Sequence, residues 1–138
     1  MTDARIEKVY ADRIAAAEYL EQADLFLADA QTSSLQAPSQ AVLLHNAAVS
    51  ACDAILSAVG LRVTPGDRSH ALRLETALSQ IDSDTEELFE RLDASRERRN
   101  EASYAAGFVA QASISDAHEA TVELLVLARE QLGTSTRS

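Results

Sequence analysis

Apolar residues in the first part of the chain recur every three or four positions, and charged residues fill the positions between them. No glycine or proline interrupts this pattern, which predicts one long amphipathic helix over residues 3–31. Its expected inward positions are Ile6, Val9, Tyr10, Ile14, Ala17, Leu20 and Leu27. Residues 32–39 (TSSLQAPS) form a predicted linker, with Pro38 in the first turn of the next helix.

Residues 39–59 are apolar on nearly every side, which predicts the central and most buried helix. Gly60 is the expected C-terminal cap, and residues 61–67 (LRVTPGD) are an expected loop with a Pro-Gly turn. Cys52 lies inside the apolar run, so we expect a small core residue and not a nucleophile. Ala47, Ala48 and Ala51 form a small-residue face that fits either a dimer contact or the core of one chain.

Three further helices follow. A shorter one is expected over about 68–80, capped by Asp67 or Ser69, with Leu72, Leu74, Ala77 and Leu78 inward. The next begins at Ser83 or Asp84 and ends at Gly107 (SDTEELFERLDASRERRNEASY and beyond), with acidic first turns and basic last turns that suit the helix dipole. The last begins at Ser113 or Ser115 and runs to Gly133, leaving residues 133–138 as a frayed tail.

This pattern predicts an all-α fold, an antiparallel up-and-down helical bundle of four long helices plus one short helix. No stretch shows a strand pattern, an internal repeat or a change of composition that would mark a second domain. We therefore expect a single domain over residues 1–138.

Composition and charge narrow the function classes. The net charge of −10 argues against broad, nonspecific binding to nucleic acid but leaves room for a small basic pocket. The single cysteine excludes a disulfide framework within one chain. The mixed-charge N-terminus is unlike a signal peptide, and no apolar run reaches the roughly 18 residues of a membrane helix. We expect a soluble cytoplasmic protein without membrane association.

The strongest chemical signal is the stretch SRERRNEASYAAG, residues 95–107. Helical spacing would align Arg96, Asn100 and Tyr104, and would place Arg99 and Ser103 on the neighbouring stripe beside Arg98. One interpretation is a solvated, charge-paired helix end, because acidic residues lie three or four positions away. The other is a phosphate site, in which guanidinium groups bind phosphate oxygens and the amide and hydroxyl groups donate.

Motifs for other chemistry are absent. The chain has no Gly-rich phosphate loop, no H-E-x-x-H, no CxxC and no EF-hand pattern. His118 with Glu119 and Glu123 offers a weak alternative metal site, for which a polar helix surface is the simpler explanation. We expect neither a metal nor another cofactor.

The order of these segments resembles the HEPN family (higher eukaryotes and prokaryotes nucleotide-binding domains). The stretch AEYLEQADLFLADAQ resembles the first long helix of such domains, and AVLLHNAAVSACDAILSAVGLR with GDRSHALRLETAL resembles their second helix, loop and third helix. RRNEASY resembles the family motif Arg-x(4–6)-His. On this mapping Arg99 is the motif arginine, with Arg98 as the alternative, Asn100 is its polar neighbour, and Tyr104 stands where the family has histidine.

The resemblance implies an all-α homodimer whose two motifs meet in a cleft. Many HEPN domains are metal-independent endoribonucleases of toxin, CRISPR or antiphage systems, whereas others are non-catalytic modules that bind a nucleotide, RNA or a protein partner. It also raises a cognate nucleotidyltransferase antitoxin as a partner that would modify Tyr104. An unrelated helical scaffold remains the third hypothesis.

Tyrosine at position 104 changes the expected chemistry, because a phenol donates a proton at neutral pH but is a weak base. If cleavage occurs, another residue supplies the base, and His45, Asp53 and His70 are the candidates. For His45 we favour a half-buried, hydrogen-bonded histidine, and for His70 a surface position at a helix start. Asp53 is expected to be the structural partner of Arg99, because an acid in so apolar a helix needs a counter-charge.

Overall fold

The computed structural model describes residues 2–32, 34, 36–94 and 111–136, and helices dominate them. The helices are α1 (Arg13–Ala30), α2 (Ala37–Val59), α3 (Ser69–Ser79), residues 86–94 and α5 (Gln111–Thr136). Two short strands, β1 (Ile6–Lys8) and β2 (Leu61–Val63), complete the described elements. The expected predominance of helix is confirmed.

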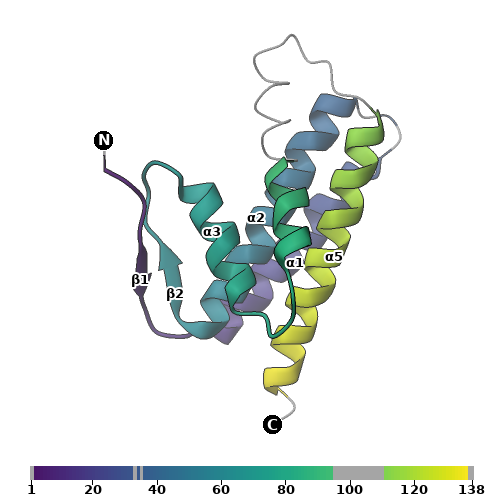
Figure 1. Ribbon diagram of the computed structural model, residues 1–138. Coiled ribbons are helices and arrows are strands. Elements are labelled where there is room, and N and C mark those ends of the chain that lie inside the picture. The colour runs from purple at the N-terminus through teal and green to yellow at the C-terminus, as the bar shows by residue number, and fades with distance from the viewer. Residues whose placement is uncertain (1, 33, 35, 95–110, 137–138) are drawn as a thin grey trace.

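The helices α1, α2 and α5 lie side by side, while α3 packs against α2 beside the two-stranded sheet (Figure 1). The start of α1 meets the end of α2, where the Asp12 amide donates to the Ser57 carbonyl at 2.9 Å. The helices α1 and α5 also run in opposite directions: Arg13 contacts Leu132 at one end, and Gln31 contacts His118 at the other.

Helix α2 is the centre of the protein, as its apolar composition predicts. Its buried residues are Leu44, Ala47, Ser50, Ala51, Cys52, Ala54, Ile55 and Leu56. Ala51, Cys52, Ile55 and Leu56 join one core cluster with residues of α1, α3, residues 86–94 and α5, whereas Leu44 belongs to a second cluster with Ala30, Ile114 and Ala117. Pro38 lies in the first turn, and Gly60 caps the helix with a left-handed φ of 78°, both as expected. Since Ala47 and Ala51 are fully buried in one chain, they belong to its core and not to an open dimer face.

The fully buried residues of helix α1 are alanines, while the larger Leu20 and Leu27 pack partly buried against the core. Ala16, Ala23 and Ala30 recur every seven residues and are 0%, 0% and 3% exposed. The expected inward positions were wrong at Val9, Tyr10, Ile14 and Ala17, which are exposed; Tyr10 and Ile14 are 98% and 77% exposed. The physical reason is close approach, because a stripe of methyl groups lets α1 lie against the central helix where longer side chains would hold the two apart.

The predicted helix over residues 3–31 was also wrong in its first ten residues, because part of that stretch forms a strand. β1 pairs antiparallel with β2, with Ile6 opposite Val63. Helix α1 begins only at Arg13, where the Asp12 side chain accepts a hydrogen bond from the Ala15 amide at 2.9 Å. The expected loop after Gly60 therefore contains β2, whose backbone groups are paired by the N-terminal residues.

Several other helix boundaries differ from expectation. α2 begins two residues early, at Ala37. α3 begins at Ser69 after Arg68, a left-handed residue with no side-chain cap, so neither expected cap forms. Asp84 does accept from the Glu86 amide at 3.1 Å, as one of the two expected caps. α5 starts at Gln111, before either expected serine.

The expected frayed tail over residues 133–138 was wrong at residues 133–136, which are helical. α5 passes through Gly133 to Thr136, because one glycine costs a helix only about 1 kcal/mol relative to alanine. The expected helical span from residue 95 to Gly107 lies outside the described residues. Within the described part of the chain, α2 is long and apolar enough to cross a membrane by length and composition, and 44% of its most apolar window is buried inside the protein.

We expect Gly60→Ala to destabilise the protein. An alanine Cβ at this position would lie 2.6 Å from the Val9 carbonyl oxygen, and the φ of 78° is itself unfavourable for an L side chain. The left-handed backbone alone should cost about 1–2 kcal/mol, measured as the free energy of unfolding in urea. Gly133→Ala is the matched control, since its Cβ meets nothing within 4 Å, and it should be neutral or slightly stabilising. Equal stabilities for the two variants would contradict the steric argument.

We also expect Ala23→Leu to lower the free energy of unfolding by about 1–3 kcal/mol, because three extra carbons must enter the closely packed face of α1. Ala28→Leu is the control on the same helix, because Ala28 is exposed and leucine keeps good helix propensity. Chemical denaturation of both variants checks this. A stable Ala23→Leu variant would show that α1 does not depend on small side chains.

Candidate functional site

The predicted phosphate-binding residues Arg96, Arg98, Arg99, Asn100, Ser103 and Tyr104 lie outside the described residues, so their roles stay predictions. His45 and Asp53 are described, and both lie on α2. The structure brings them together with His70 and Arg73 of α3. These four side chains are called the polar cluster below.

Asp53 forms an ion pair within the polar cluster. Arg73 Nε donates to Asp53 Oδ1 at 3.0 Å, and the two side chains are 17% and 31% exposed. The expected counter-charge is therefore present, but Arg73 supplies it where the sequence suggested Arg99. Arg73 was missed, although it follows His70 by three residues and so shares a face of the third helix with it.

Burial and charge act on Asp53 in opposite directions. Removal of the carboxyl group from water raises its pKa, while the charge and the hydrogen bond of Arg73 lower it. Burial is the larger effect, so the pKa of Asp53 lies above its ordinary value of 3.8. The ion pair partly compensates for the burial of this carboxylate and does not overcome it.

Arg73 also determines which ring nitrogen of neutral His70 carries the proton. Arg73 Nη1 lies 3.2 Å from His70 Nδ1. Guanidinium can only donate, so Nδ1 must accept, and the ring proton of neutral His70 is on Nε2. His70 is exposed, as expected for a residue at a helix start.

His45 completes the polar cluster as an edge-on neighbour of His70. The ring centroids lie 5.0 Å apart, with an angle of 75° between the planes. His45 is half-buried, as expected. Both rings line a cavity of about 30 Å³, together with Arg73, Cys52 and Leu92. This space holds a water molecule or two, so a phosphate group would have to bind at its mouth.

Cys52 is part of the core wall of this cavity. Burial raises the pKa of its thiol to about 12; the nearby Asp53 adds to the rise, and Arg73 opposes it. The thiol therefore stays protonated at neutral pH and is a poor nucleophile. The sequence-based prediction of an inert core residue is in accord with this environment.

The N-terminal residues hold the chain that leads into α3. The Ala4 amide donates to the Asp67 carbonyl at 3.0 Å, and the Thr64 amide donates to the Arg5 carbonyl at 2.9 Å. Gly66, with a φ of 147°, lets this turn approach the backbone of Thr2 closely. The position of His70 and Arg73 over α2 thus depends on pairing with the beginning of the chain.

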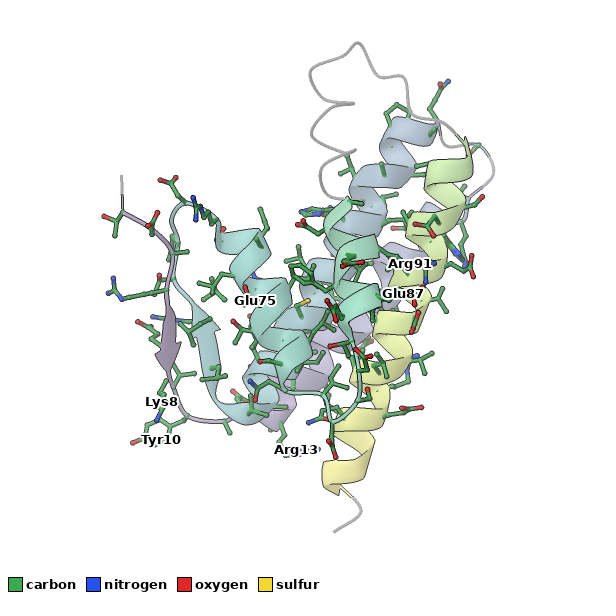
Figure 2. All side chains as sticks on the ribbon, in the orientation of Figure 1. Lys8, Tyr10, Arg13, Glu75, Glu87 and Arg91 are labelled. Atoms are coloured by element: carbon green, nitrogen blue, oxygen red, sulfur yellow. The ribbon has the colours of Figure 1, made fainter. Side chains whose placement is uncertain are left out.

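A second set of charges joins residues 86–94 to α5. Arg91 donates to Asp116 at 2.9 Å and to Glu123 at 3.4 Å (Figure 2 labels Arg91). The hydrogen bond with Asp116 is the main cause of the raised pKa of Arg91. His118, from the weak alternative metal site, lies 2.8 Å from Gln31. Among the described residues, no three His, Cys, Asp or Glu side chains are grouped to hold a metal ion.

Because the pKa of Asp53 is raised, its contribution to stability should change with pH in the opposite direction to that of a carboxylate whose pKa is lowered by an ion pair. Between the unfolded pKa, near 3.8, and the higher folded pKa, the folded state binds more protons than the unfolded state. Asp53 therefore contributes a free energy of unfolding that falls as pH rises through this window. The free energy of unfolding of wild type minus that of Asp53→Asn should therefore become smaller, or change sign, from acid to neutral pH. Urea unfolding at each pH measures this difference.

Arg73→Gln supplies the matched test. Loss of the arginine removes the effect that lowers the pKa of Asp53, so the window should extend to higher pH. A wild-type advantage over Asp53→Asn that grows as pH rises would contradict the dominance of burial and would show that the ion pair prevails.

Comparison of the chain with protein-family models, with curated proteins and with solved structures finds no match.

Proposed function

We propose that this protein is a cytoplasmic HEPN-like endoribonuclease of toxin or defence type, which cleaves RNA without a metal. The observation that supports this proposal is that His45 of α2 lies beside His70 of α3, which in turn contacts Arg73. Leu92 lines the same cavity, and the arginine-rich stretch begins at Arg96, four residues further along the chain. The proposal includes an antiparallel, HEPN-like arrangement of the helices in the bundle.

The polar cluster offers an answer to the missing motif histidine. Cleavage of RNA by its own 2′-hydroxyl needs a base, a group that stabilises the charged phosphorane, and a proton for the leaving 5′-oxygen. In this proposal His45 is the base, Arg99 stabilises the phosphorane, and Tyr104 donates the proton. His70 donates from Nε2 to a phosphate oxygen, because Arg73 holds its other nitrogen as an acceptor.

The small cavity favours a composite site. A volume of about 30 Å³ cannot enclose a nucleotide, so the RNA would lie across the surface and a second copy would complete the cleft. The proposal therefore includes a homodimer. Asn100, Arg98, Arg96 and Ser103 would hold RNA phosphates, and a nucleotidyltransferase antitoxin acting on Tyr104 would be the partner.

One observation favours a second candidate, a non-catalytic HEPN-like module that binds a nucleotide, RNA or a protein partner in an antitoxin or assembly role. Asp53 is paired with Arg73, so the described arginine of the polar cluster is neutralised before any phosphate arrives. The net charge of −10 also weakens attraction to RNA. Such a module would bind without turnover.

The test is incubation of purified protein with end-labelled RNA in EDTA. Wild type should give products that end in a 2′,3′-cyclic phosphate. Arg99→Ala should abolish them, and His45→Gln should lower the rate by about 10²–10⁴-fold through loss of the base. Arg5→Ala is the matched control, an exposed arginine on the N-terminal segment, and it should cleave like wild type.

Binding of RNA without cleavage by the folded wild type would support the non-catalytic module. Cleavage that persists in Arg99→Ala would point to a contaminating nuclease. If Arg99→Ala changes neither RNA binding nor assembly, the protein is an unrelated helical scaffold. Light scattering at micromolar concentration tests the homodimer separately.

A further inference from the structure

A groove lies between the first turns of α1 and the last turns of α5. Arg13, which is labelled in Figure 2, is one of its lining residues. Its volume is about 700 Å³, far larger than that of the cavity beside the histidines. Ile14, Ala17 and Leu20 line it from α1, and Leu132 lines it from α5. This groove was not anticipated from the sequence.

The apolar lining of the groove is open to solvent. Ile14 is 77% exposed and Ala17 is exposed, while Leu20 and Leu132 are half-buried. One exposed aliphatic side chain is ordinary on a protein surface. Here it continues into a concave apolar lining contributed by two helices, and concave apolar surface is what a docked helix buries.

The charged side chains around the groove differ in whether they have a partner within the described part of the chain. Arg13 Nη2 donates to the Leu132 carbonyl at 2.7 Å, and Arg129 forms an ion pair with Asp24. Asp24 neutralises Arg129, whereas Arg13 keeps its positive charge, because the carbonyl that accepts its hydrogen bond is neutral. Glu18 and Glu21 line the same groove, and within the described part of the chain neither has a hydrogen-bond or ion-pair partner. The groove thus presents apolar surface beside two available carboxylates.

We propose that this groove docks a basic amphipathic helix of a partner protein. Apolar side chains one turn apart on that helix would cover Ile14, Ala17 and Leu132, and flanking lysines or arginines would pair with Glu18 and Glu21. Charge complementarity selects this occupant over a second copy of the chain. A second copy would bring the same excess of negative charge, two glutamates against Arg13, to the contact, and like net charges there disfavour association.

The groove is separate from the site of the proposed function, so the two inferences stand or fall independently. The two linings share no residue: α1 and α5 form the groove, whereas α2, α3 and Leu92 form the histidine cavity.

The test uses the full chain, labelled with ¹⁵N, and a fluorescein-labelled synthetic helix of leucine and lysine residues arranged with one apolar face. NMR titration should shift the amides of the groove, and fluorescence anisotropy should give saturable binding. Ile14→Asp should weaken binding at least tenfold. The double variant Glu18→Lys, Glu21→Lys should lose the lysine probe and gain binding of a leucine-glutamate probe of the same pattern.

Two control variants separate docking from general attraction to an acidic protein. Asp29→Lys with Glu90→Lys makes the same change of net charge at exposed positions outside the groove and should bind the lysine probe nearly as well as wild type. Leu25→Ala removes an aliphatic side chain that is 62% exposed and lies outside the groove lining, and it should have no effect.

Three results would overturn the proposal. Equal loss of binding in the two charge-reversal doubles would show nonspecific attraction. Amide shifts spread over the acidic surface, with no saturation, would show the same. Self-association of the wild type that Ile14→Asp abolishes would assign the groove to a second copy of this chain.

Discussion

The close approach of α1 to α2 is the constraint on which the rest of the structure depends. α2 is apolar on nearly every side, so it must be covered from several directions, and α1 covers it with the methyl groups of Ala16, Ala23 and Ala30. A stripe of alanines brings little apolar area of its own, but it lets the two backbones lie close together. Leu124, Leu125 and Ala128 of α5 then close the core from another side.

The same constraint explains which parts of the fold could be predicted from the sequence. A helix that is apolar all round is recognised by composition, and Gly60 and Pro38 mark its ends, so α2 and its burial were predicted correctly. The inward face of α1 was not, because the usual rule gives the core to the larger side chains, and here Tyr10 and Ile14 were preferred to the alanines. Which face of α1 is buried depends on the shape of α2, and that shape cannot be read from the spacing of apolar residues along α1.

The strands show a different limit. Three residues on either side are too few for an alternation to stand out, and neither strand exists without the other. The candidate site was predictable in part: the need of Asp53 for a counter-charge follows from its apolar surroundings, whereas the choice of Arg73 depends on how α3 crosses α2. The neighbouring positions of His45 and His70 likewise come from tertiary packing and not from spacing along the chain.

The pairing of β1 with β2 has a consequence for the order in which the protein folds. Ile6 and Val63 are 57 positions apart, and closing a free loop of that length costs about 3.6 kcal/mol of chain entropy. The hydrogen bonds of so short a ladder cannot offset that cost alone. Once α1 lies antiparallel on α2, however, Val9 is already beside Gly60, and the loop left to close is short. Loop entropy therefore favours formation of the helical hairpin before the ladder.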